Sequence, residues 1–296
     1  METKLSIIHE AELWARSLWE DSLGRWANRS GQDKRYRIDV VRPAINDILG
    51  RSFPDGALNI VEFGCGDGSL LEDGVVINRI RNNGRYLGID IASDLISRAR
   101  DTFGSNRIAF EVAGLHEPRL QKVVARHGGE WNAAISVFAI QEIPGLPAVL
   151  RAMAVLLPVN TRVVFLTVHP GFGCWLRECG AMGIIDTLGD DPEEVVRLSA
   201  DRPWRWTGTY PIVDEPLNPF PLPYFHRTLD DYRVMFGEAG LDITGIVPLP
   251  GKDDLRRLTE RGSSPFAPFE TNVYWPEIGR APSSVAILAT VRNRTR

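Results

Sequence analysis

An apolar strand that runs into three glycines at alternate positions constrains this chain most. The segment reads VEFGCGDGSLL from Val61 to Leu71, and a helical pattern follows it. Glycine has no Cβ, so a turn of this kind can adopt positive φ and bring its N–H groups against a ligand. The spacing G-x-G-x-G, with Glu62 before the first glycine, differs from the G-x-G-x-x-G of dinucleotide sites. The segment therefore predicts a backbone-lined site for a nucleotide-like group other than a dinucleotide.

A second apolar strand supports this prediction. It runs from Arg85 to Ile91 (RYLGIDI) and ends in Asp90. A carboxylate at the carboxyl end of a strand can accept hydrogen bonds from both hydroxyls of a ribose. We expect Asp90 to lie beside the glycine turn, at the same edge of a sheet.

Strands and helices alternate through the middle of the chain. Strands are expected at 59–63, 85–90, 108–112, 133–137 and 162–168. Helices are expected between them at 94–103, 120–127 and 147–156. Ser93 is expected to cap the helix at 94–103. Thr228 caps a later helix that Gly240 ends, and two more strand candidates follow at 243–247 and 285–291. This order predicts an α/β fold with a doubly wound, seven-stranded, mostly parallel sheet.

The chain divides into an N-terminal helical cap, 1–50, and a larger domain, 51–296. Within the cap, Trp14, Leu18, Trp19, Leu23 and Trp26 are spaced like one face of an amphipathic helix. These side chains either cover the core or form a lid over a pocket. The stretch from about 170 to 226 is rich in proline, glycine and aromatic residues, so we interpret it as an insertion that covers a substrate.

Charge, hydropathy and cysteine content exclude several kinds of partner. The net charge of -4 and the pI near 5.8 provide no general attraction for phosphate backbones, so nucleic acid is not expected. No apolar run approaches the roughly 20 residues that span a bilayer, and no leader pattern begins the chain, so we expect a cytoplasmic protein without a membrane partner. Cys65, Cys174 and Cys179 do not have the spacing of a metal site, and no metal is expected.

VEFGCGDGSLL followed by YLGIDIASDLISRAR resembles motifs I and II of the class I S-adenosylmethionine-dependent methyltransferases, and the resemblance extends from Asn59 to Val168. It implies a sheet that closes with a sixth strand and an antiparallel seventh. It also implies S-adenosyl-L-methionine as cofactor and S-adenosyl-L-homocysteine as product. The expected reaction is methylation, at oxygen, nitrogen or carbon, of a small, partly apolar or aromatic molecule.

The resemblance also implies roles for individual residues. Gly64, Cys65 and Gly66 are expected against the methionine part, and Asp90 at the ribose. Glu62 is expected to fix the turn, and Ile91 to lie against adenine. The expected cofactor contacts are Glu62, Phe63, Gly64, Cys65, Gly66, Asp90, Ile91, Gly114, Leu115, Ser136 and Val137. The chain departs from the family pattern at Gly114, where many members have an acidic residue, and at Asn132, Gln141 and Glu142 around the fourth strand.

The acceptor side carries weaker signals. His169 directly follows the fifth strand and is placed to take a proton from a hydroxyl acceptor. Its structural alternative is to anchor the insertion, and the same two readings apply to His226. The residues expected at the substrate are Tyr36, Gln141, Glu142, Trp206 and Tyr224. The expected partner is a small molecule, and a homodimer is compatible with the sequence.

Three other functions compete with this interpretation. A methyltransferase-like protein that binds the cofactor without turnover would explain the altered residues around the fourth strand. An NAD(P)-dependent oxidoreductase shares the glycine turn and the strand-end acid, but the glycine spacing disfavours it. A nucleic-acid methyltransferase is disfavoured because the chain has neither a basic stripe nor an Asn-Pro-Pro-Tyr-like signature.

Overall fold

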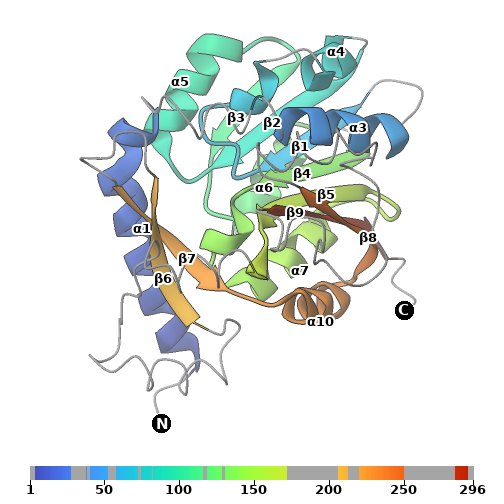
Figure 1. Ribbon diagram of the computed structural model, residues 1–296. Helices are drawn as coiled ribbons and strands as arrows, with labels where there is room; N and C mark the ends of the chain where they lie inside the picture. Colours follow the sequence, from blue (N-terminus) through green and yellow to red (C-terminus); the bar gives the residue numbers. More distant parts are fainter. Residues whose placement is uncertain are drawn as a thin grey trace, which may run out of the picture.

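The computed structural model describes residues 4–27, 38, 41–52, 58–72, 75–81, 83–115, 119–128, 131–171, 206–212, 220–249 and 284–292. Its centre is a seven-stranded sheet in the order β3-β2-β1-β4-β5-β9-β8, with helices on both faces (Figure 1). This confirms the predicted fold class. The strands are β1 (Asn59–Phe63), β2 (Arg85–Asp90), β3 (Ile108–Val112), β4 (Ala133–Val137), β5 (Arg162–Val168), β8 (Leu241–Leu249) and β9 (Ser284–Val291).

The direction of the strands follows the expected pattern. The strands β3, β2, β1, β4 and β5 pair in parallel. The last strand, β9, pairs antiparallel with both β5 and β8, as the resemblance implied for the seventh strand. The chain reverses its direction of winding between β1 and β4, and the crevice at such a switch point is where open α/β sheets bind ligands.

Helices bury one apolar cluster on each face of the sheet. One cluster contains residues of α3 (Arg42–Ser52), α4 (Val75–Arg81) and α5 (Ser93–Phe103). The other contains residues of α6 (Arg119–Arg126), α7 (Leu146–Leu156) and α10 (Leu229–Ala239). Because both faces are covered, the central strands are apolar along almost their whole length, which is typical of parallel sheets.

The structure tests the predicted starts of two helices. At α10, the Asp231 amide donates to Thr228 Oγ1 at 3.1 Å, and the Thr228 amide donates to Asp231 Oδ2 at 2.7 Å, which completes a capping box. Gly240 ends this helix with a φ of 86°, so both predicted limits are confirmed. The predicted cap of α5 was wrong. Ser93 already belongs to the helix, and its N-cap is Ala92, whose amide donates to Asp90 Oδ1 at 2.9 Å.

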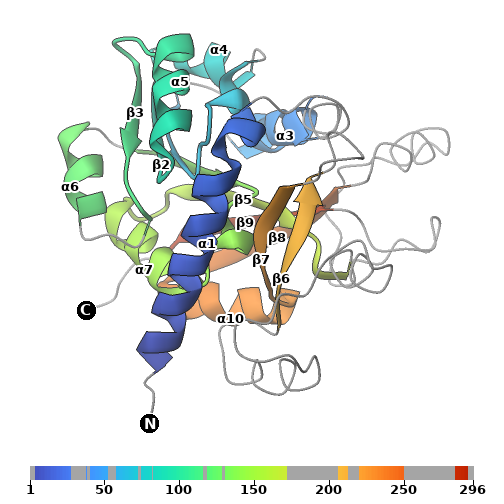
Figure 2. The same ribbon diagram turned by 90° about the vertical axis from the view of Figure 1, so that its left-hand side faces the viewer.

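The N-terminal helix α1 (Lys4–Ala27) packs beside a two-stranded antiparallel sheet, formed by β6 (Trp206–Ile212) and β7 (Phe220–His226). Figure 2 shows α1 crossing in front of the main sheet with this hairpin alongside. The rings of Trp14 and Phe225 meet edge to face, 5.8 Å between centroids, and Ala11 and Ala15 are buried against them. Within the described ranges, no helix combines the length and the apolar character needed to cross a bilayer.

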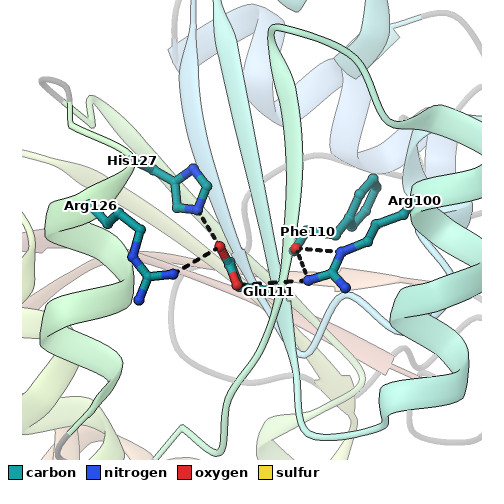
Figure 3. A network of polar contacts seen from close by, with 5 residues as sticks. All are labelled: Arg100, Phe110, Glu111, Arg126 and His127. Atoms are coloured by element: carbon teal, nitrogen blue, oxygen red, sulfur yellow. Dashed lines mark hydrogen bonds and ion pairs between the residues drawn. The ribbon is translucent and has the colours of Figure 1, made fainter.

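A polar network covers the outer edge of the sheet at β3 (Figure 3). Two guanidinium N–H groups of Arg100, on α5, donate to the Phe110 carbonyl at 2.9 and 2.7 Å. The Glu111 carboxylate lies 2.6 Å from His127 Nε2 and 3.7 Å from guanidinium groups of Arg100 and Arg126. Charged side chains of this kind prevent an edge strand from pairing with another chain.

Candidate functional site

A cleft of about 1210 Å³, measured out to the solvent at its mouth, lies at the carboxyl ends of the first four strands. Its floor consists of the turns that follow β1, β2, β3 and β4, and residues of α1 form part of its wall. Its lining residues include Glu12, Trp19, Arg42, Glu62, Gly64, Cys65, Gly66, Asp90, Ile91, Gly114, Leu115, Val137, Phe138, Glu142 and Pro144.

The turn after β1 has the backbone that its glycines predict. Gly64, Gly66 and Gly68 have φ values of 77°, 55° and 75°. A Cβ on Gly64 would lie 2.4 Å from the Cβ of Ala139, so the turn approaches the segment after β4 more closely than any side chain permits. The Gly64 and Cys65 amides both donate to the Ile89 carbonyl, at 2.8 and 3.1 Å, which joins this turn to β2.

Asp90 joins the glycine turn to the start of α5. Its Oδ2 accepts from the Gly66 amide at 2.8 Å, and its Oδ1 accepts from the Ala92 amide at 2.9 Å. Desolvation raises the pKa of Asp90 above 3.8, and hydrogen bonds from the Ala92 and Gly66 amides oppose this rise. A carboxylate has about four acceptor positions, more than the Gly66, Ala92 and Ile91 amides use, so acceptor capacity remains for a ligand hydroxyl in the cleft that Asp90 lines.

Glu62 and Cys65 lie behind and within the same turn. Glu62 is only 2 % exposed, lines the cleft, and accepts a hydrogen bond from the Tyr86 hydroxyl. Burial, followed by the nearby Asp90 and Glu62 carboxylates, raises the pKa of Cys65 well above 9.0. Cys65 is therefore a neutral thiol that packs in the turn, because a nucleophilic thiolate needs a lowered pKa.

Most of the other expected cofactor residues also line the cleft. Ile91, Gly114, Leu115 and Val137 do so, and at Gly114 the chain presents backbone where many members of the family have a carboxylate. Phe63 and Ser136 do not line it. Phe63 is buried in the apolar cluster beneath α6 and α7, and Ser136 is fully buried within β4.

The wall after β4, which we call the acceptor wall, comprises residues 138–144. Phe138, Ala139, Glu142, Ile143 and Pro144 of this segment line the cleft. Phe138 has a φ of 53°, a strained value for an aromatic residue that persists only where the surroundings enforce it. The short helix η3 (Ile140–Glu142) lies in the middle of the wall.

Gln141 and Glu142 have different positions in this wall. Gln141 is buried behind it, where Nε2 donates to the Phe138 carbonyl at 2.7 Å and to Glu142 Oε1 at 3.2 Å. Its Oε1 accepts from Thr167 Oγ1 at 3.0 Å. Glu142 is 6 % exposed and lines the cleft. Of the two residues, Glu142 is the one that reaches the ligand space.

The two histidines do not line the cleft. His169 is 6 % exposed, and its Nδ1 accepts from the Gly171 amide at 3.1 Å. Burial lowers the pKa of His169 to about 4, so the ring is neutral at pH 7. Because Nδ1 accepts, the proton of the neutral ring is on Nε2, which finds no hydrogen-bond partner among the described residues. His226 is buried in β7, with its ring 6.2 Å from that of Tyr224.

The remaining expected substrate residues are Tyr224, Trp206 and Tyr36. Tyr224 is buried in β7 and does not line the cleft. Trp206 pairs through its backbone with His226 at the start of β6. Tyr36 lies outside the described residues. Asn132, one of the departures from the family pattern, lies at the opposite end of β4, where its Oδ1 accepts from the Asn59 amide at 3.0 Å.

Sequence reasoning missed the part of the site that α1 and α3 contribute. Glu12, Ala15, Arg16 and Trp19 of α1 line the cleft. Only Trp19 carried a signal, through the apolar face whose two readings were a core cover and a lid. At the start of α3, Arg42 donates to the Ser69 carbonyl at 3.2 Å and to Glu72 Oε2 at 2.5 Å, which holds the segment after the glycine turn.

The fold of this chain matches the folds of solved structures, whereas its sequence has no match among family models or curated proteins. No protein-family model matches the sequence, and no curated protein sequence matches it. Solved structures match over most of the chain at low identity. A protein of Listeria monocytogenes described as an S-adenosylmethionine-dependent methyltransferase is 17 % identical, covers 86 % of this chain and 100 % of its own, and superposes with a TM-score of 0.54.

Two further structures agree. An S-adenosylmethionine-dependent methyltransferase of Mesorhizobium loti is 19 % identical, with 83 % of this chain and 97 % of that chain covered and a TM-score of 0.51. A third match is the structure of a complex between the Haloferax volcanii methyltransferase activator Trm112 and a methyltransferase. The matched chain is 13 % identical, and the match covers 93 % of this chain and 98 % of that chain with a TM-score of 0.54. The sheet order, the antiparallel β9 and these superpositions agree, and the chain has the fold of the class I S-adenosylmethionine-dependent methyltransferases.

Proposed function

We propose that this protein binds S-adenosyl-L-methionine and transfers its methyl group to a small, partly apolar molecule. The observation that carries the proposal is the single cleft that both the glycine turn after β1 and Asp90 at the end of β2 line. Gly64 and Gly66 place no side chains in the cleft and so leave room for the methionine end of the cofactor against the backbone. The free acceptor positions of Asp90 suit its ribose hydroxyls.

The residues around Asp90 complete a nucleoside site. Ile91, Leu95 and Leu115 provide apolar side chains next to the carboxylate, where a flat adenine ring would be desolvated. Gly114 adds no side chain and leaves its backbone groups for the edge of the base. A pyrophosphate, which the oxidoreductase alternative requires, would instead meet the Glu62, Asp67 and Asp90 carboxylates, and like charges in one site repel.

The charges in the cleft support a small acceptor over a nucleic acid. Among the described residues, the carboxylates of Glu12, Glu62, Asp67, Asp90 and Glu142 line it, against the guanidinium groups of Arg16 and Arg42. Arg16 also pairs with Glu20, and Arg42 with Glu72. A polyanionic backbone would need the opposite balance. The apolar part of the acceptor side, with Trp19, Phe138 and Pro144, suits a partly apolar molecule.

The chain can promote this reaction by orientation. When bound, the sulfonium cofactor supplies an activated methyl group for in-line displacement. The glycine turn and Asp90 would hold its two ends, and the acceptor wall would place the nucleophile opposite. Holding two reactants in line lowers the barrier without an acid or base, which agrees with two histidines that do not line the cleft. Residues of helix α1 line one side of the cleft and reduce the contact of a bound ligand with solvent.

The proposal is tested with purified protein and methyl-labelled S-adenosylmethionine. Calorimetry with S-adenosylhomocysteine measures cofactor binding, and label transfer is followed over a panel of phenols, aromatic amines, thiols and carboxylic acids. The expected results are one cofactor bound per chain and transfer to at least one compound of the panel. Absence of binding by either cofactor form, together with binding of a nicotinamide dinucleotide, would overturn the proposal.

The position of the histidines favours one second candidate, a cofactor-binding protein without turnover. His169 and His226, the side chains best suited to act as bases in the sequence, do not line the cleft. This candidate predicts that S-adenosylhomocysteine binds and that no compound of the panel is methylated. Transfer of label to any acceptor, in proportion to enzyme, would rule it out.

A further inference from the structure

A buried guanidinium lies directly behind the acceptor wall. Arg227 follows β7 and is only 1 % exposed. Its guanidinium donates to the carbonyls of Ile140, Ile143 and Pro144 at 3.2, 2.5 and 3.2 Å, and to that of Phe225 at 3.3 Å. Three of these carbonyls belong to the acceptor wall, and the fourth belongs to the β6–β7 hairpin. One side chain therefore joins two segments that are more than 80 residues apart.

Arg227 belongs to a chain of hydrogen bonds that reaches the other end of the same wall. The Tyr232 side chain is hydrogen-bonded to both Arg227 and Thr167. Thr167 donates to Gln141, and Gln141 donates to the Phe138 carbonyl. The network thus begins at Pro144, passes beneath the wall and ends at Phe138.

Hydrogen bonds from this network hold the backbone of the acceptor wall in its shape. The carbonyls at the end of a short helix such as η3 have no partners within it and need donors from elsewhere. A buried charge is tolerated only where its hydrogen bonds are made, so the guanidinium and these carbonyls stabilise one another. The positive φ of Phe138 also requires surroundings that enforce it. Removal of Arg227 leaves several buried carbonyls unsatisfied at once.

We propose that Arg227 is a positioning residue that fixes the acceptor wall, residues 138–144, and so sets where the methyl acceptor lies. Arg227 does not line the cleft and acts through the backbone of Ile140, Ile143 and Pro144. The cofactor half of the cleft, from Gly64 to Asp90, is held by other contacts and does not depend on it. The part of this inference that concerns the acceptor rests on the proposed function, and the part that concerns the wall does not.

Two variants of Arg227 and one control separate positioning from general stability. Arg227→Met removes all donors and keeps the length of the side chain, whereas Arg227→Lys restores the charge and up to three donors. The control is Arg100→Met, which removes a guanidinium that also donates to a backbone carbonyl but lies at the β3 edge (Figure 3). If Arg227→Met does not fold, Tyr232→Phe removes the hydroxyl that links Arg227 to Thr167 and keeps the ring in the core.

Hydrogen exchange on the full chain tests the wall without any ligand. Arg227→Met is expected to speed amide exchange in peptides covering 138–144 by about tenfold or more, with peptides covering 62–72 unchanged. Arg227→Lys should give an intermediate rate, and Arg100→Met should leave 138–144 unchanged. Exchange at 138–144 equal to wild type in folded Arg227→Met would overturn the inference. So would an increase spread evenly over the sheet.

Binding and turnover then test the consequence for the acceptor. Affinity for S-adenosylhomocysteine should change less than about threefold in Arg227→Met. The kcat with the best acceptor of the panel should fall about tenfold or more and recover in part with Arg227→Lys. If cofactor affinity and kcat fall by the same factor in Arg227→Met, the proposal that Arg227 holds only the acceptor wall and not the cofactor half of the cleft is contradicted. If wild type itself does not bind the cofactor, the proposed function fails, and the exchange experiment still decides the role of Arg227.

Discussion

Replacing Asp90 with asparagine tests the ribose end of the cleft with the smallest change of shape. The Asp90 carboxylate accepts the Gly66 amide with one oxygen and the Ala92 amide with the other. Asparagine has one oxygen and one NH₂ group, so it can satisfy only one of these two amides. The other amide would face a donor, and the negative charge that strengthens the remaining bonds would be lost.

These losses determine the expected magnitudes. A hydrogen bond to a charged group contributes about 1.5 to 3 kcal/mol, so we expect the free energy of unfolding to fall by about 1 to 3 kcal/mol. The smaller value applies if relief of the desolvation that raises the pKa of Asp90 offsets part of the loss. The ribose hydroxyls lose a charged acceptor as well. We therefore expect affinity for S-adenosylhomocysteine to fall by about 10- to 100-fold.

Calorimetry and urea denaturation measure both effects on the same preparation. Asp94→Asn is the matched control, since Asp94 is an exposed carboxylate in the first turn of α5, four residues further on, and does not line the cleft. The control should keep wild-type cofactor affinity. If folded Asp90→Asn binds S-adenosylhomocysteine within about twofold of wild type, the assigned role of Asp90 is refuted.

Three further changes probe the turn, the buried histidine and the helix over the cleft. Gly64→Ala should lower the free energy of unfolding by about 2 to 4 kcal/mol, because the residue has a positive φ and its new Cβ would overlap Ala139. Gly128→Ala is the control, since Gly128 has a positive φ in open space, and it should lower the free energy of unfolding by about 1 to 2 kcal/mol. Equal losses of the two variants in urea denaturation would refute the close approach of Gly64 to Ala139. His169 has a pKa of about 4 when folded against 6.5 in the unfolded chain, so only the unfolded state takes up its proton between these values. The free energy of unfolding should therefore fall by up to about 3 kcal/mol from pH 6.5 to 4. If His169→Gln shows the same dependence of the free energy of unfolding on pH as wild type, His169 is not the cause of the fall. Trp14→Ala removes the edge-to-face contact with Phe225, so in limited proteolysis α1 should be cleaved earlier than the strands of the main sheet. Cleavage of α1 and of the sheet at the same rate would contradict a role of this contact in holding α1.

The sheet and the cofactor half of the cleft could be predicted because their signals are local. A glycine turn requires particular φ values wherever it occurs, and a carboxylate that ends a parallel strand lies at the same edge as the neighbouring turn. The positive φ of Gly64, Gly66 and Gly68 and the hydrogen bond from Gly66 to Asp90 follow from that short stretch of sequence. The capping box at Thr228 is similarly local.

The acceptor half could not be predicted because distant segments build it. Glu12 lines the cleft because α1 packs against β7, and Arg227 reaches Ile140 across 87 positions of the chain. Neither contact leaves a periodic or motif-like pattern. The start of α5 is a local exception, since Asp90 accepts the amide of Ala92, the N-cap, and Ser93 already lies in the helix. The histidines are candidate bases by residue type, and only the fold reveals that His169 Nδ1 accepts the Gly171 amide and that His169 does not line the cleft.

The structure of a complex with S-adenosylhomocysteine tests the central claim most directly. The account predicts both ribose hydroxyls within hydrogen-bond distance of the Asp90 carboxylate, the methionine end against the turn at Gly64 to Gly66, and the sulfur facing the acceptor wall. A nucleoside bound elsewhere, or one whose ribose leaves Asp90 untouched, would contradict it.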